Sequence, residues 1–164
     1  MKPLVVIDTN VLQVANQNSP QAGTKCVRQC IDRLLEVRDR ERIALDKSMF
    51  ILEEYRKQGF SFSGQPGVGD EFFRWLFDNQ ANNDVCELVD VTPTNKSGNN
   101  FAEFPDVPEL EDFDRSDRKF VAVAINSGVR PPILNAVDSD WWDFRDSLCQ
   151  HGVKIEFVCP RQFK

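Results

Sequence analysis

The sequence lacks several features that large classes of proteins need. Its one histidine, His151, argues against a two-histidine ribonuclease and leaves little room for Ser-His-Asp or Cys-His catalysis. No apolar run approaches the roughly 20 residues that cross a bilayer, so we expect no membrane association. The apolar run at 4–7 is too short for the core of a signal peptide, and Asp8 ends it. These absences predict a cytoplasmic protein.

The motifs of common metal and nucleotide sites are also missing. The five cysteines contain no C-x-x-C pair, and nothing at zinc-ligand spacing follows Cys26 and Cys30. We therefore expect buried free thiols. The glycine-rich stretch at 61–69 contains neither G-x-G-x-x-G nor a P-loop lysine, which excludes a nucleotide cradle. His151 lies just before Gly152, where we expect a helix to end, and we interpret it as a C-terminal cap.

Basic residues are scarce, with 20 Lys and Arg against 26 Asp and Glu and a net charge of −6. A protein that binds nucleic acid through a general electrostatic footprint would be basic, so tight nonspecific binding is not expected. A carboxylate metal site, however, is negative until its cations bind. The net charge therefore does not exclude a metal-dependent nuclease.

The segments that are present alternate between strand-like and helix-like patterns. Residues 4–7 form an unbroken apolar run, typical of a strand buried on both faces. Between 27 and 35, apolar residues recur at helical spacing. We expect strands at 4–7, 43–45, 85–91, 133–137 and 155–159, and helices around 25–40, 48–58 (ended by Gly59), 71–80, 117–125 and 141–150.

This alternation predicts an α/β fold, namely a three-layer α/β/α sandwich with a mainly parallel, roughly five-stranded sheet. The length of 164 residues fits a single domain over 1–164. A longer, loop-rich segment lies around 59–115. We interpret its acidic part, 103–114, as a solvated loop, while a cover for the site or a partner contact remains the alternative.

Carboxylates occur where such a fold would gather them. Asp8 directly follows the first strand, and Asp138 and Asp140 follow a later one. Asp117 opens a helix, and Glu54 lies on the helix after the second strand. In parallel sheets, sites form outside the carboxyl ends of the strands. Like charges gathered there would repel one another, and hard cations such as Mg²⁺ or Mn²⁺ would relieve that repulsion.

Each acid also has a structural interpretation. Asp8 and Asp138 fit turn or N-cap positions. Asp117 fits the favourable end of a helix dipole, and Glu54 fits an exposed helix charge. The arrival of carboxylates from four separate segments at one expected crevice is what favours a metal site over these alternatives.

The same residues resemble the motifs of PIN-domain nucleases, in the correct order along the chain. The segment VVIDTNVL at 5–12 resembles the opening motif, in which a strand ends in Asp-Thr-Asn or Asp-Thr-Ser. Asp117 and the alanine-containing helix after it resemble the third motif. The sequence DSDW at 138–141 resembles the last motif, although Ala136 replaces its usual Thr. Glu54, followed by an apolar residue, fits the remaining motif better than its neighbour Glu53 does.

The resemblance implies the strand order 3-2-1-4-5 and a nuclease that hydrolyses phosphodiester bonds with Mg²⁺ or Mn²⁺. The substrate it implies is single-stranded RNA, with single-stranded DNA as the second choice. It also allows a homodimer and a toxin role with a protein antitoxin as partner. The residues it assigns to the metal and to catalysis are Asp8, Glu54, Asp117 and Asp138, with Asp140 as a further ligand or water-positioning group.

Four neighbouring residues are candidates for supporting roles. Thr9 or Asn10 would hydrogen-bond a metal-bound water or a substrate phosphate. Arg118 and Lys119 would contact phosphates, although a surface role fits them equally well. Two other functions remain open: a non-catalytic PIN-like binding module and a Rossmann-like metal-dependent phosphatase. The phosphatase would normally need a second Asp where this chain has Asn10.

Overall fold

The structure, a computed structural model, describes residues 1–58 and 66–163. The helix end expected at Gly59 and the first part of the glycine-rich stretch at 61–69 lie outside the described residues. Among the helices that are described, none is both long and apolar enough to cross a bilayer.

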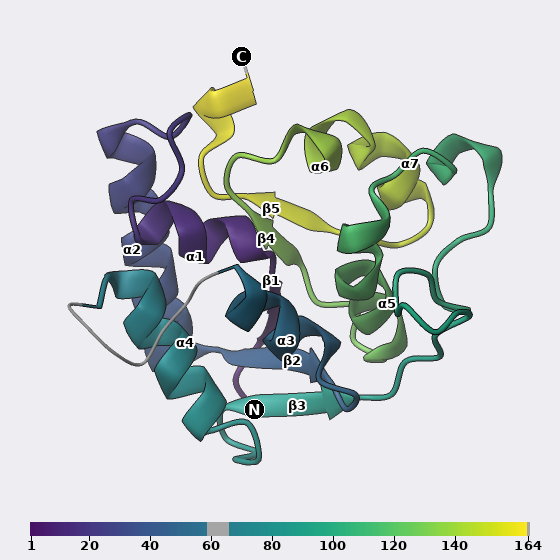
Figure 1. Cartoon of the computed structure of the whole chain (residues 1–164), viewed down its shortest axis with the longest axis horizontal. Helices are drawn as coiled ribbons and strands as arrows, with labels where there is room; N and C mark the ends of the chain where they lie inside the picture. The colour runs from purple at the N-terminus through teal and green to yellow at the C-terminus, as the bar shows by residue number, and fades with distance from the viewer. Residues whose placement is uncertain (59–65, 164) are drawn as a thin grey trace.

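Five parallel strands form one sheet in the order β3-β2-β1-β4-β5 (Figure 1). This confirms the predicted α/β class and strand order. All four residues of β1 are buried, as expected for the central strand of a sheet covered on both faces. The strands are β1 (Leu4–Ile7), β2 (Arg42–Asp46), β3 (Cys86–Val89), β4 (Ile133–Asn135) and β5 (Ile155–Phe157).

Helices connect the strands and cover the sheet. The α1, α2 and α4 helices pack against one another, whereas α5 packs against β1, β2 and β4. Because β2 and β4 lie on opposite sides of β1, right-handed crossovers place these two groups on opposite faces. The helices are α1 (Thr9–Ala15), α2 (Thr24–Arg40), α3 (Phe50–Lys57), α4 (Val68–Asp78), α5 (Arg118–Asn126), α6 (Ser139–Asp143) and α7 (Arg145–Gln150), with short 3-10 turns η1 (Pro108–Leu110), η2 (Arg115–Asp117) and η3 (Pro160–Phe163).

Two helical expectations need correction. No helix was predicted between the first strand and residue 25, yet α1 begins directly after Asp8, which is its N-cap. The single helix expected at 141–150 is two helices, α6 and α7, which meet at Phe144. The rings of Phe144 and Phe113 pack edge to face, with their centroids 5.6 Å apart. That contact comes from a distant segment, so local periodicity did not reveal the break.

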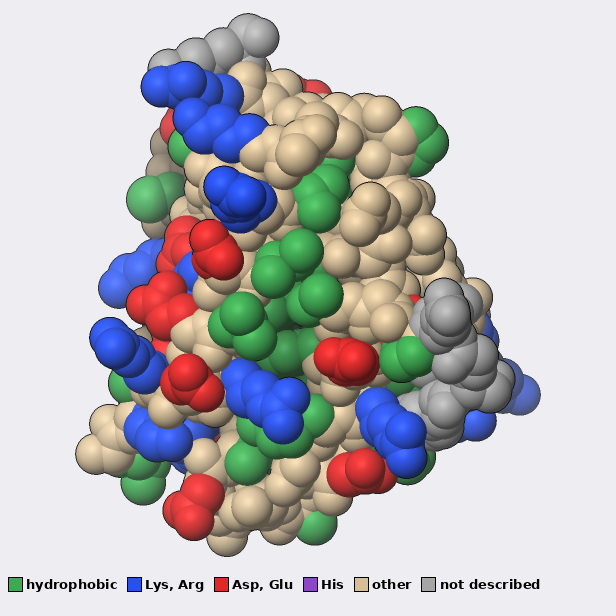
Figure 2. Space-filling view, turned by 90° about the vertical axis from the view of Figure 1, so that its left-hand side faces the viewer, with side chains coloured by type: hydrophobic (Ala, Val, Ile, Leu, Met, Phe, Trp, Pro, Cys, Tyr) green, Lys and Arg blue, Asp and Glu red, His purple; other side chains and the backbone are tan. Residues whose placement is uncertain are grey.

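The α2 helix is amphipathic, as its sequence indicates. Cys30 and Leu34 are buried, whereas Leu35 is 51% exposed, although we placed it on the same apolar face. Figure 2 views the side of the molecule that carries α2 and α4, where apolar side chains gather between charged ones. In α4, Phe72 and Phe73 are buried in the core.

The loop-rich segment before η2 is more than a solvated loop. It carries an isolated bridge between Pro93 and Phe101 and the turn η1. Phe101, Phe104 and Phe113 are each at most 5% exposed. The acidic side chains of this segment do lie largely at the surface. The segment therefore alternates buried aromatic anchors with exposed acids.

The expectation that all cysteines are free thiols was wrong. Cys26 at the start of α2 and Cys159 after β5 form a disulfide across 133 residues of sequence, with their Cα atoms 5.4 Å apart. Among the free thiols, Cys30 and Cys86 are buried and Cys149 is exposed. Sequence spacing gave no sign of the pairing, because α2 and the end of β5 become neighbours only when the sheet has formed.

We expect Cys159→Ser to lower the free energy of unfolding by about 2–5 kcal/mol, because the disulfide restricts a long loop of the unfolded chain. Denaturant unfolding without reductant measures this effect, and the exposed Cys149→Ser is the control that should leave stability unchanged. Thiol titration of the unfolded, unreduced protein should find three free thiols. Five free thiols, and no effect of reductant on stability, would contradict the pairing.

Candidate metal centre

Two aspartates lie just beyond the carboxyl ends of the neighbouring strands β1 and β4. Each caps a short helix: the Asp8 carboxylate accepts a hydrogen bond from the backbone of Asn10, and Asp138 accepts one from the backbone of Asp140. The N-cap role that the sequence allowed is therefore present. It uses a single oxygen of each carboxylate, so it does not exclude a second role.

Asp117 joins this pair from η2, the turn that leads into α5. One carboxylate oxygen from each of Asp8, Asp117 and Asp138 lies within 4.8 Å of the others. Unlike the other two, the Asp117 side chain forms no capping hydrogen bond at the start of its helix. The structure therefore brings together three of the acids that the sequence put forward as metal ligands.

A second acidic group shares Asp117. Oxygens of Asp114, Asp117 and Asp140 also lie within 4.8 Å of one another, and the backbone N–H of Asp114 donates to Asp140 Oδ2 at 3.2 Å. Asp114 was not predicted to belong to the site, because it was counted with the acidic stretch at 103–114. The available signal was its spacing of three residues before Asp117, about one helical turn.

Two buried carboxylate oxygens in this cluster have no hydrogen-bond partner: Asp8 Oδ1 and Asp117 Oδ2. Asp46 at the end of β2 is an instructive contrast, because it is equally buried but both its oxygens accept backbone hydrogen bonds, from Phe50 at 2.7 Å and Ile51 at 2.9 Å. An unsatisfied buried acceptor costs stability. A bound cation would satisfy both orphaned oxygens.

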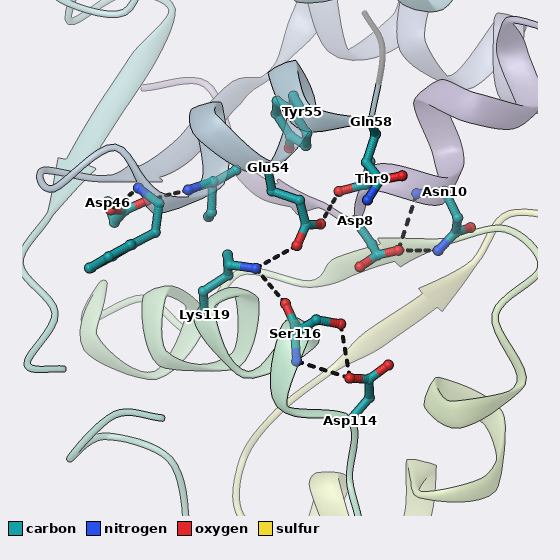
Figure 3. Close-up of polar contacts among 12 residues, drawn as sticks. Asp8, Thr9, Asn10, Asp46, Glu54, Tyr55, Gln58, Asp114, Ser116 and Lys119 are labelled. Carbon is teal, nitrogen blue, oxygen red and sulfur yellow. Dashed lines mark hydrogen bonds and ion pairs between the residues drawn. The ribbon is translucent and has the colours of Figure 1, made fainter. Parts of the chain in front are cut away.

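Asn10 fixes the orientation of Asp8. Its side-chain amide donates to Asp8 Oδ2 (Figure 3). The same amide donates to Asn135 Oδ1, and its oxygen accepts from the backbone of Ala136 and Val137. All polar atoms of the Asn10 side chain therefore bind protein groups. Asn10 was expected to bind a metal-bound water or a substrate phosphate, but here it supports the site by orienting Asp8. Asn135, which is fully buried, was not identified from the sequence.

Glu54 lies beside the cluster but outside both acidic groups. One of its oxygens accepts from the Thr9 hydroxyl and the other from the Lys119 ammonium (Figure 3). Glu53 instead pairs with Arg56, and both of these side chains are substantially exposed. Of the two glutamates, Glu54 is therefore the one that faces the cluster, as its sequence context favoured.

The two basic residues after Asp117 lie in different surroundings. Lys119 binds Glu54 and the carbonyl oxygen of Ser116, next to the aspartates. Arg118 points into the loop-rich segment, where its guanidinium donates to backbone carbonyls of that segment, including Glu111 O at 2.9 Å. Of the two residues proposed to contact phosphates, only Lys119 is thus held by Glu54 beside the cluster.

Burial and mutual repulsion shift the acids toward their neutral forms. Desolvation, followed by the charges of Glu54 and Asp138, raises the pKa of Asp8 from 3.8 to about 7. Desolvation, followed by the charges of Asp8 and Asp138, raises the pKa of Asp117 well above its usual range. Without a cation, the cluster therefore favours bound protons near neutral pH, and a divalent cation would reverse this preference.

In metal-free buffer we expect Asp8 to make stability depend on pH. Because its pKa is higher in the folded state, its contribution is complete below about pH 4 and is lost as the pH rises through about 7. Wild type should lose about 2–4 kcal/mol more stability than Asp8→Asn between pH 4.5 and 8.

Urea unfolding across this pH range in EDTA measures the difference between the two proteins, with the exposed Asp84→Asn as control. Adding Mn²⁺ should reduce the loss in wild type. A difference between wild type and Asp8→Asn that stays constant with pH would contradict the raised pKa.

Comparisons of the chain with protein-family models, with curated proteins and with solved structures found no significant match.

Proposed function

We propose that the protein is a divalent-metal-dependent nuclease that hydrolyses phosphodiester bonds in single-stranded RNA. The observation that carries this proposal is the pair of buried, unpartnered oxygens of Asp8 and Asp117 within a cluster of aspartates. An all-carboxylate site suits Mg²⁺ or Mn²⁺, which prefer oxygen ligands. The resemblance to PIN-domain nucleases agrees with this chemistry.

Two acidic groups that share Asp117 suit a pair of cations. Asp8, Asp117 and Asp138 would hold the first, and Asp114, Asp117 and Asp140 would hold the second. The chemistry that cations would supply there is activation of water for in-line attack and stabilisation of the charge on the attacking and leaving oxygens. In the hydrolysis, the water oxygen would form a bond to phosphorus as the bond to the leaving oxygen breaks, and a proton released by the water would neutralise the leaving oxygen.

Glu54 has a different role in this proposal from the direct metal ligand expected from the sequence. Both of its oxygens are bound, to Thr9 and Lys119, so it holds the Lys119 ammonium in place beside the aspartates. A fixed positive charge there would attract the substrate phosphate and offset the repulsion between phosphate and carboxylates. Thr9 acts through Glu54 rather than on substrate.

The other two candidate functions have less support. A phosphatase with Asp8 as nucleophile would want a second acid at position 10, and the Asn10 amide there is committed to Asp8 and the end of β4. A non-catalytic module would have no need of buried, unsatisfied carboxylates. An RNA strand remains the proposed partner.

The homodimer, the protein antitoxin and the cytoplasmic location remain predictions. Disulfides are uncommon in reducing compartments, so the Cys26–Cys159 bond makes the location a question for direct measurement.

Asp8→Asn should reduce cleavage of labelled single-stranded RNA by roughly 100-fold or more, because losing a direct ligand should cost more than losing a supporting residue. The assay compares Mg²⁺, Mn²⁺ and EDTA, with single-stranded DNA in parallel. Glu53→Gln, an exposed acid next to the site, should retain activity. Cleavage that persists in EDTA or in Asp8→Asn would contradict the proposed site.

Glu54→Gln tests whether Glu54 holds Lys119 or a metal. We expect it to lower cleavage while Mn²⁺ affinity, measured by calorimetry, stays within about threefold of wild type. The Lys119→Met variant should lower cleavage in the same way. Glu54→Gln removes the carboxylate that holds the Lys119 ammonium in place, and Lys119→Met removes the ammonium itself. A loss of Mn²⁺ affinity in Glu54→Gln comparable to that in Asp8→Asn would instead assign Glu54 as a ligand.

A further inference from the structure

The loop-rich segment forms a hollow of about 680 Å³ between residues 94 and 118. This volume falls within the range of small-molecule sites. Phe101 and Phe104 contribute to its lining, and polar groups surround them. Its polar lining residues include Asn100, Asp106, Glu111, Arg115 and Arg118.

Arg118 holds the walls of this hollow together. Its guanidinium donates to the carbonyls of Leu110, Glu111 and Phe113 and to Asn100 Oδ1, and it lies 4.3 Å from the centre of the Phe104 ring. The buried guanidinium of Arg118 therefore joins Asn100 and residues 110–113 to the start of α5. This bonding gives the hollow a fixed shape rather than that of a loosely packed loop.

The hollow lies directly beside the metal centre. Arg115, which lines it, is flanked in the chain by Asp114 and followed two residues later by Asp117, both members of the acidic cluster. Consecutive Cα atoms are about 3.8 Å apart, so the hollow and the cluster share one turn of backbone. A ligand in the hollow would therefore contact the same turn of backbone that carries Asp114 and Asp117.

The lining offers two kinds of polar group. Arg115 is exposed and makes no hydrogen bond or ion pair within the described residues, so its guanidinium is free for an anionic group. Asp106 and Glu111 are exposed carboxylates, which would accept hydrogen bonds from a ligand. One free cation beside two acids does not suit a polyanion. It suits a ligand with one phosphate and a hydrogen-bond-donating edge.

We propose that this hollow is a nucleotide-binding subsite, which holds the base of the nucleotide next to the phosphodiester that is cleaved. Its base would present an exocyclic amino group to Asp106 or Glu111, and its phosphate would contact Arg115. The subsite gives the enzyme a preference for adenine, guanine or cytosine over uracil at this position. This inference rests on the proposed nuclease function and adds a base preference to it.

Binding of 5′-mononucleotides in EDTA tests the subsite without requiring catalysis. Amide chemical shifts followed by NMR should change in residues 94–118, and AMP, GMP or CMP should bind about tenfold more tightly than UMP. Arg115→Met should weaken binding about tenfold, and the Asp106→Asn/Glu111→Gln pair should remove the discrimination against UMP. Arg28→Met and Glu109→Gln, which change exposed charges outside the hollow, are the matched controls.

Equal shifts with ribose 5-phosphate would mean that Arg115 binds anions without reading a base, and would overturn the proposal. No saturable change with any mononucleotide would also overturn it, even if the protein cleaves RNA in Mn²⁺. Conversely, selective nucleotide binding by a protein that cleaves nothing would support the subsite and reject the nuclease. The two failures are therefore distinguishable.

Discussion

The amide of Asn10 holds together the part of the molecule on which the candidate site depends. It joins the end of β1 to the end of β4, through Asn135 and the backbone of Ala136 and Val137. The same side chain binds one oxygen of Asp8 and leaves the other free. Without this bridge, neighbouring strands would still pair, but Asp8 would be oriented only by the capping hydrogen bond from the Asn10 backbone.

Gathering carboxylates in this way destabilises the metal-free protein. Burial, followed by the repulsion between neighbouring carboxylates, raises the pKa values of Asp8 and Asp117. Natural proteins retain such arrangements where function requires them, and perturbed ionisable groups cluster at functional sites. Asp46, equally buried but fully hydrogen-bonded, shows that burial of an acid in this fold does not by itself leave an oxygen unsatisfied.

The two arginines and lysine around Asp117 divide the work between structure and site. Arg118 organises the loop-rich segment, Lys119 pairs with Glu54 beside the aspartates, and Arg115 remains free at the surface. These three basic side chains, which lie within five residues of one another in the sequence, thus have three different environments. Side-chain direction on a short turn, rather than residue type, separates them, and this direction depends on the packing of residues 94–113.

Residue patterns alone predicted the α/β class and the placement of Asp8 and Asp138 at strand ends, because strand periodicity and short strand-end motifs are local. They also placed Asp117 at a helix start. The strand order, which is not local, came from the resemblance to PIN-domain nucleases. Only the tertiary structure decided which acids meet: it added Asp114, joined Glu54 to Lys119, and paired Cys26 with Cys159. These contacts join segments distant in sequence or depend on side-chain direction, neither of which residue spacing encodes.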